Sequence, residues 1–180
     1  SDALLALDQW VIGRLHEIQS KIINNYESYS FHKVSQCLHN FCVVDMGGFY
    51  LDVIKDRLYT TPADCHARKS AQTALYHTAE SMVRWIAPIL SFTAEEIWQF
   101  LPGKRMESVF LSDWHQLPEN PSIEIDWQGI DVVQGIASKA LEVARDQGVI
   151  GSSLDACIVF YAEGEMAALL SSFGDELHFL

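Results

Sequence analysis

Residues 4–22 read LLALDQWVIGRLHEIQSKI, and this stretch decides the fold class of the 180-residue chain. Its apolar side chains follow one another at spacings of 3, 4, 4, 3 and 4 residues, at Leu4, Leu7, Val11, Leu15, Ile18 and Ile22. The mean spacing equals one turn of an α-helix, about 3.6 residues. The stretch therefore predicts an amphipathic helix that buries one face, as helices of a bundle do.

The next stretch repeats the helical spacing as far as Leu58, with the pair Gly47-Gly48 in its middle. Ser30 is a residue type that caps helices, so we expect a helix to begin just after it. Glycine costs about 1 kcal/mol inside a helix, which makes a pair of them unusual. We interpret the pair as a place where another helix or strand packs closely.

A third helix is predicted from about Arg68 to Ala87, and its core-facing residues are expected to be Leu75, Ala79, Met82 and Ile86. Pro88 must interrupt this helix, because proline cannot donate the next backbone hydrogen bond. Residues 93–96, Thr-Ala-Glu-Glu, have the pattern of a capping box and predict a restart. We expect Trp98, in that next helix, to be buried against the bundle.

The remainder of the chain is less regular. We expect residues from about 103 to 127 to form a loop that wraps over the bundle, anchored by Phe110, Trp114 and Trp127. A further helix from Ile130 to about Gln147 follows, and then a helix over 165–173 between two short strands, over 156–161 and 177–180. The predicted fold is mainly α: a bundle of four to five helices in residues 1–127, followed in 128–180 by a further helix and a small α+β piece that the chain ends inside.

Charge is distributed unevenly along the chain. The formal net charge is −12, which argues against a protein that binds nucleic acid over its whole surface. Residues 1–110 carry 10 Lys and Arg against 12 Asp and Glu, whereas residues 111–180 carry 2 against 12. Any contact with RNA is therefore expected in the first 110 residues.

Several classes of protein find no support in the sequence. No apolar run reaches the roughly 18–20 residues of a membrane span, and we expect no signal peptide at Ser1, because no basic region precedes an apolar stretch there. Four scattered cysteines suit a reducing cytoplasm better than a disulfide framework. A small hydrolase using Cys and His would need a clustered dyad, and a zinc site would need closer ligand spacing than Cys37, His39 and Cys42 provide. We expect neither a catalytic nor a metal site.

The basic residues lie in small groups. Lys55, Arg57, Arg68 and Lys69 flank one loop between two predicted helices, so they can form a single patch near one end of the bundle. Such a patch is the usual footprint of contact with phosphates. The alternatives are that Lys55 and Arg57 pair with the neighbouring Asp52 and Asp56, or that the patch docks on another domain.

Three stretches together resemble a known family. Residues 45–60, DMGGFYLDVIKDRLYT, and residues 31–42 before them resemble the helical bundle of bacterial isoleucyl-tRNA synthetases. Residues 85–98, WIAPILSFTAEEIW, are similar to a motif shared by the class I synthetases for isoleucine, valine and leucine. Residues 150–156, IGSSLDA, resemble the family's turn into its first C-terminal strand, although Gln147-Gly148-Val149 stands where a lysine is usual.

The resemblance implies a function. It points to the anticodon-binding helix bundle of an ATP-dependent isoleucine–tRNA ligase, which holds the anticodon stem-loop of isoleucine tRNA. The family's His-Ile-Gly-His and Lys-Met-Ser-Lys signatures, which handle ATP, do not occur in this chain. The resemblance therefore implies that ATP and magnesium bind to a catalytic domain elsewhere in the ligase, that zinc binds in a module beyond Leu180, and that no cofactor binds here.

Two other functions remain open on the sequence. One is the same domain of a valyl- or leucyl-tRNA synthetase, which residues 46–48, Met-Gly-Gly, disfavour. The other is a free-standing helical protein-interaction domain, for which a native start and stop would be expected. On the favoured interpretation the partners are isoleucine tRNA and the catalytic domain, the location is the cytoplasm, and no membrane is involved.

Overall fold

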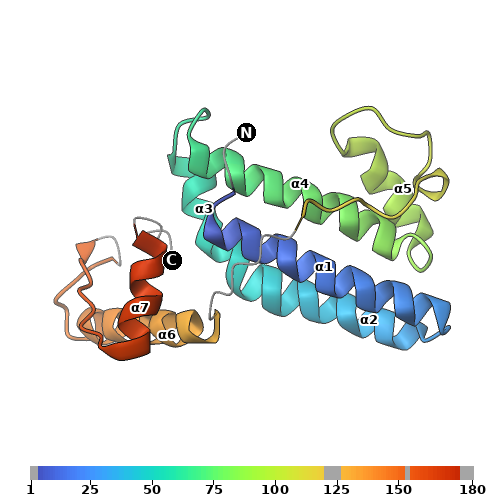
Figure 1. The fold of residues 1–180 in the computed structure, drawn as a ribbon. Coiled ribbons are helices and arrows are strands. Elements are labelled where there is room, and N and C mark those ends of the chain that lie inside the picture. Colours follow the sequence, from blue (N-terminus) through green and yellow to red (C-terminus); the bar gives the residue numbers. More distant parts are fainter. Residues whose placement is uncertain (1–3, 120–126, 153–154, 175–180) are drawn as a thin grey trace. The chain divides into compact units, whose positions relative to one another are not determined.

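The computed structural model describes residues 4–119, 127–152 and 155–174. Within these ranges the chain forms two compact units. The first contains α1 to α5 and two short irregular helices, and the second contains α6 and α7 (Figure 1). None of the described helices is both long and apolar enough to cross a bilayer.

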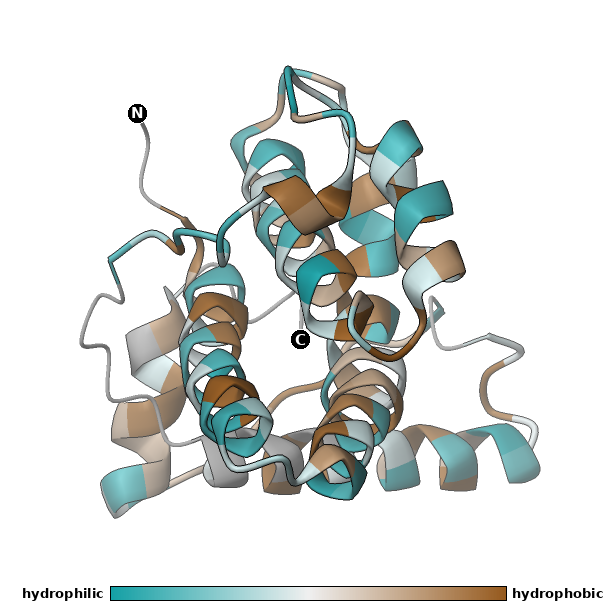
Figure 2. Ribbon diagram, turned by 90° about the vertical axis from the view of Figure 1, so that its right-hand side faces the viewer, coloured by the Kyte–Doolittle hydropathy of each residue, from teal (hydrophilic) through white to brown (hydrophobic). Residues whose placement is uncertain are grey.

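Helix α1, Ala6–Glu27, lies at the centre of the first unit. It packs against both α2 and α4. Its inward stripe is the one that the sequence predicts, with full burial of Leu7, Val11, Leu15, Ile18 and Ile22. The expected amphipathic helix is therefore confirmed, and Figure 2 shows hydrophobic and hydrophilic residues alternating along it and its neighbours.

The second helical stretch is continuous but changes its winding in the middle. It comprises α2, Phe31–Asn40, the π-helix η1, Phe41–Tyr50, and α3, Leu51–Thr60. The backbone stays helical at both junctions, Phe41 and Leu51, so the three segments form one rod. Ser30 precedes the rod as expected, although its side chain makes no capping hydrogen bond.

The interpretation of Gly47 and Gly48 as a close-packing site is wrong. Both residues are exposed and lie in the π-helix. A Cβ atom at Gly47 would lie 3.0 Å from the carbonyl oxygen of Cys42, and one at Gly48 would lie 3.0 Å from that of Val43. The wider π winding brings the carbonyl five residues back beneath each Cα, so these glycines make room for their own helix.

Helix α4, His66–Ile86, packs on α1 through a face of small side chains. The residues expected to face the core, Leu75, Ala79, Met82 and Ile86, are only half-buried. The buried stripe lies beside them, at Ala67, Ser70, Ala71, Ala74, Thr78, Ser81 and Trp85. Apart from Trp85, the residues of this stripe are small, which leaves room for α1 to pack against this face of α4.

Pro88 separates α4 from α5, Ser91–Phe100, as expected. The predicted capping box is wrong, because α5 begins before Thr93 and has no side-chain cap. Glu95 instead accepts hydrogen bonds from Ser108 and, at 3.2 Å, from the amide of Val109. Trp98 is buried as predicted, at 2% exposure.

The loop after α5 is held by a residue that the sequence does not single out. It includes the 3₁₀ turn η2, Val109–Leu111, and Val109 packs in a cluster with Val83, Ala94 and Trp98. Phe110, expected as an anchor, is 55% exposed, and Trp114 is 36% exposed. Trp127 is the first residue of α6, and its side chain is outside the described part.

The second unit contains α6, Trp127–Asp146, and α7, Gly164–Phe173, close to the predicted bounds of both helices. The described residues contain no strand, so the fold is mainly α as predicted but the α+β piece is not confirmed. Residues 156–161 have no regular secondary structure. A strand needs a neighbour to complete its hydrogen bonds, and the expected partner, 177–180, lies outside the described residues.

Candidate nucleic-acid interface

The four basic residues singled out from the sequence lie around the turn between α3 and α4, and we call them the α3–α4 patch. Lys55 and Arg57 come from α3, and Arg68 and Lys69 come from the first turn of α4. The two helices pack against each other, which places both pairs at one end of the bundle. Their environments differ widely, however.

Arg57 is part of the core rather than of the surface. Its side chain is 1% exposed, and its two terminal nitrogens donate to the carboxylate of Asp8 at 3.0 and 3.1 Å. Tyr50 donates to the same carboxylate at 2.7 Å, and Ser70 donates to its other oxygen. A buried charge that is paired and hydrogen-bonded in this way holds helices together, so Arg57 is withdrawn from the expected RNA contacts.

Lys55 is exposed, and its ammonium group donates to Asp52 at 2.6 Å. This hydrogen bond and the charge of Asp52 raise the pKa of Lys55. The expected alternative, pairing with a neighbouring aspartate, therefore holds for Lys55. Ion pairs this exposed are weak because water screens them, so a phosphate could replace Asp52.

Arg68 and Lys69 are consecutive residues, but their side chains lie in different surroundings. Arg68 is half-buried and donates from Nη1 to the carbonyl of Thr61 at 2.9 Å, which fixes the turn after α3. Lys69 is exposed. The surface charge of the α3–α4 patch is thus carried by Lys55 and Lys69, with a partial contribution from Arg68.

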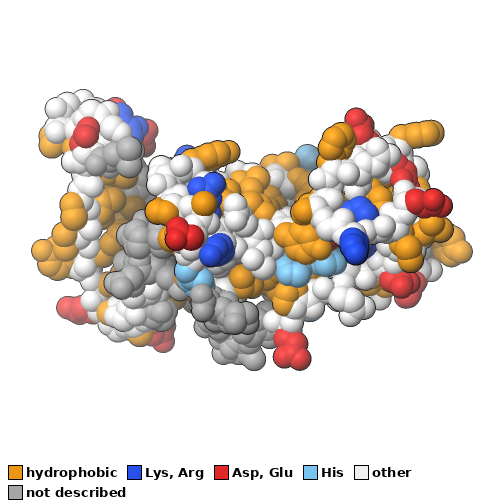
Figure 3. Space-filling view, turned by 90° about the horizontal axis from the view of Figure 1, so that it is seen from above, with side chains coloured by type: hydrophobic (Ala, Val, Ile, Leu, Met, Phe, Trp, Pro, Cys, Tyr) orange, Lys and Arg blue, Asp and Glu red, His pale blue; other side chains and the backbone are white. Residues whose placement is uncertain are grey.

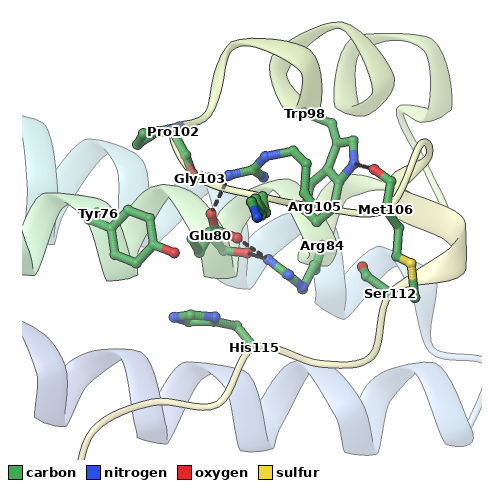
Figure 4. Close-up of a pocket in the computed structure, with 11 residues that line it drawn as sticks. Tyr76, Glu80, Arg84, Trp98, Pro102, Gly103, Arg105, Met106, Ser112 and His115 are labelled. Atoms are coloured by element: carbon green, nitrogen blue, oxygen red, sulfur yellow. Dashed lines mark hydrogen bonds and ion pairs between the residues drawn. The ribbon is translucent and has the colours of Figure 1, made fainter.

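A second group of basic residues lies toward the other end of α4. Here α4, α5 and the following loop line an open pocket of about 580 Å³, which we call the Trp98 pocket. Its lining includes Tyr76, Glu80, Arg84, Trp98, Arg105 and His115. Figure 4 shows Tyr76 on one side of Glu80 and the Arg105 and Trp98 side chains on the other, with His115 below.

Glu80 is the electrostatic centre of this pocket. It accepts hydrogen bonds from Arg84 at 2.6 Å and from Arg105 at 2.9 Å. Burial opposes the ionisation of Glu80, but these hydrogen bonds and charges outweigh burial and lower its pKa. The glutamate is therefore ionised at neutral pH and holds both guanidinium groups in place.

The same two arginines cover Trp98. The guanidinium carbons of Arg84 and Arg105 lie 4.7 and 4.5 Å from the centre of its ring. Nε and Nη1 of Arg105 are buried and have no hydrogen-bond acceptor in the described part of the chain. The electron-rich face of Trp98 attracts the Arg105 guanidinium and so offsets part of the cost of burying these nitrogens without an acceptor.

Two histidines contact the ring of Tyr76, and one of them, His115, lines the pocket. Nδ1 of His77 and Nε2 of His115 are 2.9 Å apart, so one of the two rings donates a hydrogen bond to the other. Burial lowers the pKa of His115 to about 4, and the charges of His77 and Arg84 act in the same direction. Burial also lowers the pKa of His77. Both rings are therefore neutral at pH 7.

The sequence does not reveal the Trp98 pocket as a site. Arg84 stands alone in the sequence, and Lys104-Arg105 is an ordinary surface pair of charges. Arg84 and Arg105 come together only because the loop after α5 folds back over α4, where both pair with Glu80. Figure 3 views the molecule from the side of α4 and shows the basic side chains over this helix in two groups, with hydrophobic and histidine side chains between them.

The described residues contain no group of three or more His, Cys, Asp or Glu side chains that could hold a metal ion. Cys37 is half-buried and Cys42 is exposed.

Comparison with known proteins gives one family and a set of close relatives. Residues 8–160 match the family described as the anticodon-binding domain of tRNA ligase. The chain is 50% identical over 184 residues to an isoleucine–tRNA ligase of Halorhodospira halophila, covering 100% of this chain and 20% of that protein. It is 52% identical over 182 residues to that of Nitrosococcus oceani, covering 98% of this chain and 19% of that protein. The chain spans about a fifth of the length of these relatives.

Proposed function

The chain belongs to the anticodon-binding domain family of tRNA ligases, and on that premise we propose that it binds the anticodon stem-loop of isoleucine tRNA. The ligase of which it forms part joins isoleucine to that tRNA at the cost of ATP, in the cytoplasm. ATP, magnesium and the zinc implied by the family resemblance act elsewhere in that ligase. The described residues contribute binding rather than catalysis.

One observation carries the proposal beyond family membership. In a chain of formal charge −12, basic side chains gather in two groups over one helix, around Lys69 and around Arg84. These residues are 15 positions apart on α4, which corresponds to about 22 Å along the helix axis. An RNA hairpin offers phosphates over such a span, and its single-stranded loop offers bases that protein side chains can contact.

The identity of the tRNA is supported by the relatives. Both relatives named above are isoleucine–tRNA ligases at about half identity, which disfavours the valine and leucine alternatives. A free-standing interaction domain is disfavoured by the family match over residues 8–160.

Salt titration of RNA binding tests the α3–α4 patch directly. Lys55→Ala and Lys69→Ala are each expected to weaken binding of an isoleucine anticodon stem-loop and to reduce the slope of log K against log salt by about one. Lys33→Ala is the matched control, since Lys33 is an exposed lysine of α2 outside both basic groups. Unchanged affinity and slope in both variants would move the RNA surface away from this patch.

A further inference from the structure

The Trp98 pocket is not needed to explain family membership, and its chemistry is specific. We infer that it holds one unstacked nucleotide of the bound anticodon loop, with the base against Tyr76 and the adjoining phosphate beside Lys104 and Arg105. This inference rests on the proposed function and names the place where the loop would be contacted.

The size of the pocket suits one nucleotide. Its volume of about 580 Å³ lies within the range of about 300–1,000 Å³ that is usual for sites of small molecules. The pocket is open to solvent, and its lining includes the basic residues Arg84, Lys104 and Arg105. A base turned out of a single-stranded loop could enter without displacing a helix.

The charge of the pocket suits a phosphate. The lining of the pocket includes three cationic side chains, Arg84, Lys104 and Arg105, and one carboxylate, Glu80, which leaves a formal charge of +2. Lys104 is exposed, so its ammonium group is accessible to an anion. The pocket is therefore positively charged in a chain that has twice as many acidic as basic residues, 24 against 12.

The aromatic surface available to a base is Tyr76. Trp98 cannot serve, because it is 2% exposed and lies under two guanidinium groups. Tyr76 is 39% exposed, and its ring faces the pocket from α4 (Figure 4). Any base can stack on such a ring, and stacking of this kind is a main source of affinity for single-stranded RNA.

The pocket is also held rigid before any ligand arrives. Arg84 donates to the carbonyl of Asp113 at 2.8 Å, and Nε1 of Trp98 donates to the carbonyl of Met106 at 2.8 Å. Arg105 donates to the carbonyl of Pro102. These bonds fix the loop on both sides of the cavity, so little ordering is required when a nucleotide binds.

A double-mutant cycle between protein and RNA tests the inference. Tyr76→Leu in the whole chain is combined with isoleucine anticodon stem-loops that lack the base at one loop position in turn, and affinities are measured by fluorescence anisotropy. Tyr76→Leu alone is expected to weaken binding about fivefold or more, as loss of one stacked base does. At one loop position the double change should weaken binding no further than the single changes, because both remove the same contact.

Three further variants separate stacking and charge from general damage. Tyr76→Phe keeps the ring and should bind as the wild type does, while Tyr161→Leu removes a 96% exposed ring outside the pocket and should have no effect. Lys104→Gln should reduce the salt slope by about one. Circular dichroism of each variant confirms that the helices are intact.

The outcomes distinguish this inference from the proposed function. If the wild type binds the stem-loop and the losses are additive at every loop position, the pocket holds no base and the inference fails while the proposed function stands. If the wild type does not bind the stem-loop at all, the proposed function fails and the inference fails with it.

Discussion

Arg57 shows how the role of a single residue depends on a partner distant in the sequence. Its neighbours, Lys55 and Asp56, suggest a surface lysine–arginine group, yet its guanidinium is buried against Asp8, 49 positions earlier. Nothing in the local sequence distinguishes Arg57 from Lys55. The difference arises only when α1, α3 and α4 come together around the Asp8 carboxylate.

The buried pair gives a prediction about stability. Arg57→Ala leaves Asp8 buried without its main partner, and removal of one member of such a pair typically costs about 3–5 kcal/mol. Chemical denaturation followed by circular dichroism measures the free energy of unfolding. Lys55→Ala, which alters only an exposed ion pair, is the control and should leave the unfolding curve where it is. A small loss for Arg57→Ala would show that Asp8 finds other partners.

His115 gives a prediction about pH. Burial lowers its pKa in the folded chain from 6.5 to about 4. The unfolded chain therefore binds the proton more readily, so the stability associated with neutral His115 is complete above about pH 6.5 and is lost as the pH falls toward about 4. His115→Gln should make the melting temperature fall less steeply over that interval, whereas His39→Gln, at an exposed site, should follow the wild type. Parallel curves for all three proteins would contradict this assignment.

At the scale of elements, the helices differ in how well they can be predicted. The prediction of the buried stripe of α1 is correct because its large apolar residues, at helical spacing, all lie on one face of the helix. The predicted buried stripe of α4 is wrong because the same rule favours large residues, whereas the buried stripe consists, apart from Trp85, of small ones. A helix with two candidate faces cannot be oriented without its neighbour.

The π-helix η1 was not predicted, since no apolar spacing distinguishes it from an α-helix over so short a stretch. The pair Gly47-Gly48 is the one feature of the sequence that marks this π-helix, but the sequence alone does not say why two glycines are needed there. The physical cause is lack of room for a side chain, because a Cβ atom at either position would lie 3.0 Å from a carbonyl oxygen of its own helix.

The same contact predicts whether an alanine at Gly48 raises or lowers the stability of the protein. In an α-helix, Gly→Ala stabilises by about 1 kcal/mol. Gly48→Ala should instead destabilise by about 1–2 kcal/mol, as overpacking does, because the new methyl group would lie 3.0 Å from the Val43 oxygen. Gly135→Ala in α6, where a Cβ meets nothing within 4 Å, is the matched control and should stabilise. Stabilisation by Gly48→Ala in a denaturation experiment would mean that the rod is α-helical at that point.

For the whole molecule, the sequence predicted the mainly α fold, and it placed the expected RNA contacts in the first 110 positions. It could not predict which basic residues share a surface. Lys69 and Arg84 lie on one helix, and Arg105 joins Arg84 through Glu80 only because a loop folds back over α4. The α3–α4 patch was thus predicted in part, and the Trp98 pocket was not.

The central claim, that this chain binds an anticodon stem-loop, is tested most directly by comparing three RNA hairpins at one low salt concentration. The first carries the anticodon arm of isoleucine tRNA, the second keeps its stem but has an unrelated tight loop, and the third carries the arm of leucine tRNA. Affinity of the whole chain for each is measured by fluorescence anisotropy. We expect saturable binding of the isoleucine hairpin that is at least tenfold tighter than binding of the other two, or about 1.4 kcal/mol. Equal affinity for all three hairpins, or no saturable binding of the first, would contradict it.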